Sequence, residues 1–157
     1  MHLYWVMNKL TEIENPDMHS KQILIIEDDR QTLLMLQWIL QEQGFQVHAS
    51  QDFNDAADFL SQHQPSLIIS DLLGSGKTTG LDFYLQHVME KKIPFALVSG
   101  TFYLLPSKVR FVKNSQNPQV GSITLDNLHK SSDSIQCFEK PFDVSDILHH
   151  FHLSPAA

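Results

Sequence analysis

Apolar residues gather in five short segments of the chain. Three are continuous runs, at residues 23–26, 67–69 and 95–98. A continuous run of this length is typical of a strand that is buried on both faces of a parallel sheet. The other two, residues 45–49 and 135–139, alternate apolar and polar side chains. Alternation predicts strands with one wetter face, as at the edges of a sheet.

Between these strands, apolar residues recur at i, i+3, i+4 and i+7, the spacing of an amphipathic helix. The three stretches with this spacing are residues 53–60, 81–88 and 144–151. Asp52 and Asp143 stand where the N-caps of two of these helices belong. A further helix is predicted over residues 31–43, where Gly44 provides the stop. This helix is apolar on more than one side.

Strands that alternate with helices predict a doubly wound α/β fold with helices on both faces of a parallel sheet. Three central and two edge strands match the five-stranded, flavodoxin-like order 2-1-3-4-5. We expect one domain over residues 22–152, preceded by an N-terminal extension (1–21) and followed by a tail (153–157). Residues 101–134, between the fourth and fifth strands, form an atypically long and polar segment.

The composition limits which partners and which cellular compartment fit the chain. The 157 residues carry a formal net charge of −7, which argues against a nucleic-acid partner because phosphate backbones are held by Lys and Arg. Cys137 is the single cysteine, so no disulfide can form within the chain, and a reducing cytoplasm fits best. No apolar run reaches the length of a membrane span, and charged residues interrupt the first twenty residues, which excludes a signal peptide.

The ends of the predicted strands carry the candidate chemistry. The first strand ends in Glu27 and Asp28, the third in Asp71, the fourth in Ser99 and the fifth in Lys140. In a doubly wound sheet the carboxyl ends of the strands form the active crevice, so these side chains should meet there. Two carboxylates about 4 Å apart repel by about 4 kcal/mol at an effective dielectric constant near 20. Such a cluster needs a cation, and Mg²⁺ is usually held by carboxylates together with phosphate oxygens.

At these positions the chain resembles the response regulator receiver domains of two-component systems. The resemblance rests on ILIIEDD, PSLIISD, FALVSG and FEKPF, and it covers roughly residues 22–152. It implies that Asp71 is the phosphoacceptor, assisted by Ser99 and Lys140. It further implies that Mg²⁺ is bound by Asp28, Asp71 and the Leu73 carbonyl, with Glu27 acting through water. The family also implies a small Gly100 beside the acceptor and a cis Lys140-Pro141 peptide bond.

The partners implied by the resemblance are a sensor histidine kinase or a phosphotransfer protein upstream and an unidentified protein target downstream. The sequence departs from the family in three places. The loop LLGSGKTTG after Asp71 lacks the customary proline, Cys137 replaces the usual aromatic switch residue, and the 101–134 segment is long. We expect this segment to be the output surface, with the apolar residues 102–105 moving together with Ser99 and with basic Lys108, Arg110 and Lys113 favouring an acidic partner.

Three other interpretations fit the sequence less well. GSGKTTG lacks the first glycine of a phosphate-binding loop, because that position is Asp71. An aspartate-nucleophile phosphatase needs a second carboxylate two residues on, where Leu73 stands. His149, His150 and His152 suit a solvated helix end better than a metal site. The alternative left open is a pseudo-receiver, a binding scaffold that works without phosphorylation.

Overall fold

A computed structural model describes residues 21–73, 78–100, 109–112, 120–123 and 134–154 of the chain. The extension before Lys21, residues 74–77 of the loop LLGSGKTTG, three parts of the long 101–134 segment and the last three residues lie outside the described residues. The predictions for residues 102–105, Lys108 and Lys113 therefore stay predictions. The same holds for Arg110, whose backbone alone is described.

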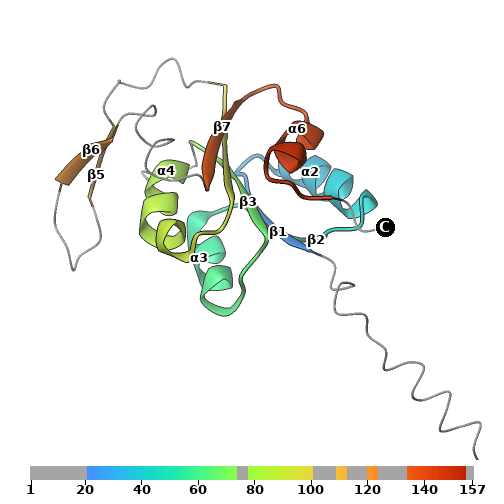
Figure 1. Cartoon of the computed structure of the whole chain (residues 1–157), viewed down its shortest axis with the longest axis horizontal. Coiled ribbons are helices and arrows are strands. Elements are labelled where there is room, and N and C mark those ends of the chain that lie inside the picture. Colours follow the sequence, from blue (N-terminus) through green and yellow to red (C-terminus); the bar gives the residue numbers. More distant parts are fainter. Residues whose placement is uncertain (1–20, 74–77, 101–108, 113–119, 124–133, 155–157) are drawn as a thin grey trace, which may run out of the picture.

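A five-stranded parallel sheet forms the centre of the domain (Figure 1). Its strands are β1 (Gln22–Ile26), β2 (Gln46–Ser50), β3 (Leu67–Asp71), β4 (Phe95–Ser99) and β7 (Ile135–Glu139). Their order is β2-β1-β3-β4-β7, so the predicted order of the five parallel strands is confirmed. The two alternating segments are the edge strands, and the three continuous apolar runs lie between them, as predicted.

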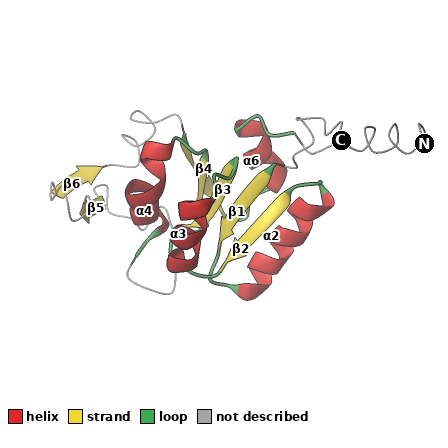
Figure 2. Ribbon diagram, turned by 90° about the horizontal axis from the view of Figure 1, so that it is seen from below, coloured by secondary structure: helices red, strands yellow, loops and turns green. Residues whose placement is uncertain are grey.

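Helices cover both faces of the sheet. They are α2 (Arg30–Glu42), α3 (Phe53–Gln62), α4 (Gly80–Phe83) and α6 (Val144–His150). One half of the core joins α3 and α4 to β1, β3, β4 and β7, and the other half joins α2 and α6 to the opposite face (Figure 2). Strand residues alternate between the two halves: Leu24 and Ile68 face α3 and α4, whereas Ile23 and Ile69 face α2 and α6.

The helix ends follow the predicted capping. Asp52 accepts a hydrogen bond from the backbone N–H of Asp55, and Asp143 accepts one from that of Ser145. Gly44 follows α2 with a φ of 90°, a conformation that favours glycine. The prediction of one regular helix over residues 81–88 is wrong in detail. The helix α4 is followed by a π-helical turn, Tyr84–Val88. The sequence could not predict this turn, because the apolar stripe fixes which face of a helix is buried but not its hydrogen-bond spacing.

The long segment between β4 and β7 contains regular structure that the sequence did not predict. Strands β5 (Val109–Val112) and β6 (Val120–Ile123) pair antiparallel in a separate two-stranded sheet. The sequence predicted only a long and polar segment here, so these two strands add to that prediction. Each strand is only four residues long, too short for the alternation of apolar and polar positions to stand out.

Candidate functional site

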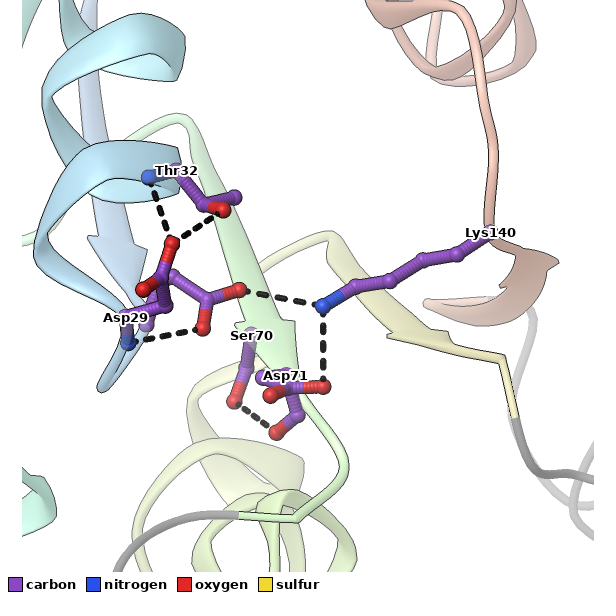
Figure 3. A network of polar contacts seen from close by, with 6 residues as sticks. Asp29, Thr32, Ser70, Asp71 and Lys140 are labelled. Atoms are coloured by element: carbon purple, nitrogen blue, oxygen red, sulfur yellow. Dashed lines mark hydrogen bonds and ion pairs between the residues drawn. The ribbon is translucent and has the colours of Figure 1, made fainter.

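The carboxyl ends of the parallel strands bring distant residues together. Asp71 ends β3, Glu27 follows β1 directly and Lys140 follows β7 directly. The ammonium nitrogen of Lys140 lies 3.1 Å from Oε2 of Glu27 and 3.5 Å from Oδ1 of Asp71 (Figure 3). One cation from the edge of the sheet therefore bridges two carboxylates from the central strands.

Glu27 is held in place on both of its carboxylate oxygens. Its side chain is buried, Oε2 accepts a hydrogen bond from Lys140, and Oε1 accepts one from the backbone N–H of Asp29 at 3.1 Å. Asp29 in turn is the N-cap of α2, where Oδ2 accepts hydrogen bonds from the backbone N–H and the hydroxyl of Thr32. Asp29 therefore serves as a helix cap, and Glu27 and Asp28 remain as the acidic pair of the site.

Three carboxylates form the acidic part of the site. Glu27, Asp28 and Asp71 each offer an oxygen atom, and these oxygens lie within 4.8 Å of one another. Glu27 is buried, Asp71 is half-buried and Asp28 is exposed, so the group opens to solvent on the side of Asp28. One ammonium group faces three carboxylates, which leaves an excess of negative charge. Oxygen ligands of this kind suit a hard divalent cation such as Mg²⁺.

The electrostatics of the site reflect this imbalance. Burial raises the pKa of Asp71, and the nearby charge of Asp28 adds to that rise while Lys140 opposes it. Burial likewise raises the pKa of Glu27, and Asp71 contributes in the same direction. For Lys140, burial acts to lower the pKa, but the carboxylates of Asp71 and Glu27 outweigh it and the pKa is raised. The site therefore favours the charged form of Lys140 and disfavours the charged forms of Glu27 and Asp71.

Two neighbours of Asp71 were missed by the sequence reasoning. The hydroxyl of Ser70, which is fully buried, donates to the backbone oxygen of Asp71 at 2.9 Å. A Cβ atom at Gly80 would lie 2.3 Å from the same backbone oxygen. Only glycine allows α4 to begin so close to the end of β3. Ser70, a polar residue in an otherwise apolar strand, was the available signal for the first contact; none was available for the second.

A profile of the response regulator receiver domain matches residues 23–101 of the chain. The chain belongs to this family. It is a receiver domain of the response regulator type, a signalling domain of two-component systems. The prediction of the family from the four strand-end motifs is thereby confirmed.

Solved receiver domains share the fold. The chain is similar to a response regulator receiver protein from Sinorhizobium medicae, with 18% identity, a TM-score of 0.62, and 85% of this chain and 93% of the other covered. It is similar to the chemotaxis protein CheY4 from Vibrio cholerae, with 17% identity, a TM-score of 0.60, and 85% and 97% covered. It is also similar to the receiver domain of the hybrid histidine kinase CckA, with 16% identity, a TM-score of 0.57, and 83% of this chain and 95% of the other covered. At such identities the likeness shows the fold alone.

The remaining residues expected at the receiver site lie around the same edge. Ser99 is buried at the end of β4, and its backbone oxygen accepts a hydrogen bond from the backbone N–H of Lys140 at 3.1 Å. The Lys140-Pro141 peptide bond is cis, as the resemblance implied. A Cβ atom at Gly100 would meet only Lys140, at 3.9 Å. Leu73 is 49% exposed two residues after Asp71, where it forms an isolated antiparallel bridge with Thr79.

The receiver domain departs from its family at the switch position in β7. Cys137 is partly buried and packs against the core half that contains α3 and α4. Burial raises the pKa of its thiol to about 11, so the thiol stays protonated and uncharged near neutral pH.

Among the described residues, no helix has both the length and the apolar character needed to cross a membrane.

Proposed function

We propose that this receiver domain accepts a phosphoryl group on Asp71 in an Mg²⁺-dependent reaction. The observation that carries the proposal is the position of Lys140, whose ammonium lies within 3.5 Å of both Asp71 and Glu27 in a group of three carboxylates. Such an arrangement can neutralise a phosphoryl group in transfer, which needs charge stabilisation and positioning more than covalent help.

The residues of the site fit a magnesium ion. Asp28, Asp71 and the Leu73 carbonyl would hold it directly, and Glu27, occupied by Lys140 and the Asp29 backbone, would act through water. When bound, the ion supplies positive charge that offsets the carboxylates and the oxygens of the phosphoryl group. An exposed Asp28 leaves the metal position open to solvent, which suits an ion that keeps several waters.

The protein side chains then divide the transfer between them. A carboxylate oxygen of Asp71 attacks phosphorus, the bond from phosphorus to the donor breaks, and the donor leaves with the electron pair of that bond. Lys140, already beside Oδ1 of Asp71, stabilises the charge on the phosphoryl oxygens. Ser99 closes the site from β4, where its hydroxyl donates to a phosphoryl oxygen.

The proposal extends to partners and location. The phosphodonor is a sensor histidine kinase or a phosphotransfer protein, and the output is a contact with a downstream protein, in the cytoplasm. A pseudo-receiver remains the second candidate, because Cys137 offers no aromatic ring that could move between buried and exposed positions when Asp71 is phosphorylated. Such a scaffold would recognise its partner in one fixed state.

Incubation with acetyl phosphate and Mg²⁺, followed by intact-mass measurement, tests the proposal. The parent chain should gain one phosphoryl group. Asp71→Asn should gain none, and Asp28→Asn should gain it far more slowly. Asp58→Asn, which removes an exposed carboxylate on α3, is the matched control and should label like the parent. Labelling of Asp71→Asn, or equal labelling in EDTA, would refute the proposal, and no labelling of the parent would favour the scaffold.

A further inference from the structure

Ser70 is a buried polar side chain near the end of an apolar strand. It is fully buried on β3, and Ile68 and Leu72, two residues before and after it, belong to the half of the core that contains α3 and α4. The hydroxyl of Ser70 donates a hydrogen bond to the backbone oxygen of Asp71 at 2.9 Å (Figure 3). Burying a hydroxyl is unfavourable unless it forms a hydrogen bond, so this bond makes a serine compatible with the position.

The backbone oxygen of Asp71 lies where the sheet offers it no partner. The pairing of β1 with β3 ends at Ile26 and Ser70, and the next N–H of that chain, from Glu27, donates to β2 instead. Successive residues of a strand face opposite neighbours, and Leu72 donates its N–H to β4, so Asp71 faces the side of β1 where the ladder has ended. Among the described residues, the donor to this oxygen is the hydroxyl of Ser70.

The same oxygen is enclosed from the side of α4. A Cβ atom at Gly80 would lie 2.3 Å from it and 2.9 Å from Oγ of Ser70, so Gly80 lies directly against this hydrogen bond. The N–H of Gly80 donates to the oxygen of Leu72 at 2.7 Å, and the N–H of Leu72 donates to Val98 at 2.9 Å. The peptide units on both sides of Leu72 are therefore held in place, and Ser70 holds the oxygen of the first one.

This stretch of backbone carries atoms of the proposed phosphorylation site. The peptide unit that Ser70 holds begins at the Cα atom of Asp71, whose carboxylate oxygen Oδ1 lies 3.5 Å from Lys140. Two residues after Asp71 is Leu73, whose carbonyl is a proposed ligand of Mg²⁺. A turn of this peptide unit would displace both ligands. In metal sites, removing a group that orients a ligand typically lowers affinity or activity by about 10- to 100-fold.

We propose that Ser70 is a positioning residue of the acceptor site, which acts by fixing the backbone of Asp71 and, through it, the Asp71 carboxylate and the Leu73 carbonyl. The inference rests on the proposed function, because it assigns Ser70 to the same site. The competing role is a serine that contributes to stability alone. A positioning role changes the affinity for Mg²⁺ and the rate of phosphorylation, whereas a role in stability alone changes only the free energy of unfolding.

Three substitutions separate the two roles. Ser70→Ala removes the hydroxyl, and Ser70→Thr keeps it. Ser50→Ala is the matched control, because Ser50 is likewise buried, at the end of β2, and donates to the backbone oxygen of Asp52 at 2.7 Å. Ser70→Ala should weaken the binding of Mg²⁺ alone, measured by calorimetry, by about tenfold, and should slow labelling by acetyl phosphate at saturating Mg²⁺ by a similar factor. Ser70→Thr should restore most of both, and Ser50→Ala should change neither while it lowers the urea midpoint.

A measurement on the metal-free protein tests the backbone contact itself. In Ser70→Ala, the amide protons of Leu72 and Gly80 should exchange with solvent several-fold faster than in the parent, because the peptide unit after Asp71 is no longer held at its oxygen. In Ser50→Ala, the same two amide protons should exchange at the rate of the parent. Circular dichroism verifies that each variant is folded, and Ser70→Cys, whose thiol is also a donor, takes the place of Ser70→Thr if the added methyl group prevents folding.

The results that would overturn the inference are distinct from those that refute the proposed function. If the parent is labelled and Ser70→Ala binds Mg²⁺ and is labelled equally well, this inference alone is wrong. The same holds if Ser50→Ala loses as much as Ser70→Ala, or if the folded variant that keeps a donor behaves like Ser70→Ala. A parent chain that neither binds Mg²⁺ nor becomes labelled refutes the proposed function, and the role of Ser70 with it.

Discussion

Removing the charge of Asp71 should stabilise the metal-free protein, although it removes one partner of Lys140. The substitution is Asp71→Asn, which keeps the shape of the side chain. The attraction between Asp71 and Lys140 at 3.5 Å is about 4.7 kcal/mol at an effective dielectric constant near 20. This attraction is lost in the variant. Any stabilisation must therefore come from removing the repulsion between Asp71 and the carboxylates of Glu27 and Asp28.

The repulsion is larger than the attraction. The oxygens of Glu27 and Asp71 lie within 4.8 Å, which gives at least about 3.5 kcal/mol of repulsion at the same dielectric constant. Asp28 lies within the same distance but is exposed, and solvent screening reduces its contribution to roughly 2 kcal/mol. The difference leaves a net repulsion of about 1 kcal/mol on Asp71, and burial of the charged carboxylate adds to it.

Thermal and urea unfolding with and without Mg²⁺ measure the effect. Without metal, Asp71→Asn should raise the unfolding midpoint by about 2–4 °C, the shift expected from 1 kcal/mol in a domain of this size. Mg²⁺ at about 100 times its Kd should add about 2.7 kcal/mol to the parent and much less to the variant, which reverses their order. Asp58→Asn is the surface control and should change neither value.

This prediction is wrong if Asp71→Asn is less stable than the parent in EDTA. In that case the ion pair with Lys140 outweighs the crowding of carboxylates. It fails equally if Mg²⁺ stabilises the parent and the variant by the same amount, because the metal would then bind elsewhere. A neutral result for Asp58→Asn is required for either conclusion.

Three further predictions address pH, backbone contact and packing. The pKa values of Glu27 and Asp71 are raised in the folded state, so protonation of these groups stabilises the fold at a pH below their unfolded pKa values near 4. This stability is lost as the pH rises through their folded pKa values. Urea unfolding in EDTA at a series of pH values should show the loss. Gly80→Ala should cost about 1–3 kcal/mol, since its Cβ would overlap the Asp71 backbone oxygen, and a near-neutral Gly80→Ala would contradict the close approach. Tyr84→Phe removes a hydroxyl that lies 3.0 Å from the Ser134 hydroxyl and should cost about 0.5–1.5 kcal/mol in urea unfolding; no loss would mean that water replaces the bond.

The sheet could be predicted well from the sequence, because strands that are buried on both faces need continuous runs of apolar residues. Residues 23–26 and 95–98 admit few polar side chains, whereas the edge strands alternate. The π-helical turn at Tyr84–Val88 and the pairing of β5 with β6 left no comparable mark. Hydrogen-bond spacing within a helix and pairing of very short strands depend on the surrounding structure more than on local pattern.

The site was predictable for a related reason. In a parallel sheet the strand order alone decides which residues meet at the carboxyl edge, so Glu27, Asp71 and Lys140 could be placed together from three separate motifs. What the sequence could not supply was distance. The 2.3 Å approach of a Cβ at Gly80 depends on how α4 leaves the loop after β3, a geometry set by non-local packing.

The contacts around Asp71 also limit how a change at this residue can spread. Its backbone oxygen has no spare room on the side of Gly80, and the N–H of Gly80 donates to the oxygen of Leu72 at 2.7 Å. A displacement at the end of β3 must therefore shift the start of α4. Four residues later Tyr84, fully buried, contacts Ser134 at the end of the long segment before β7. Because Cys137 has no ring to reorient, this path through Gly80 and Tyr84 connects Asp71 to Ser134 without relying on the switch position of the family.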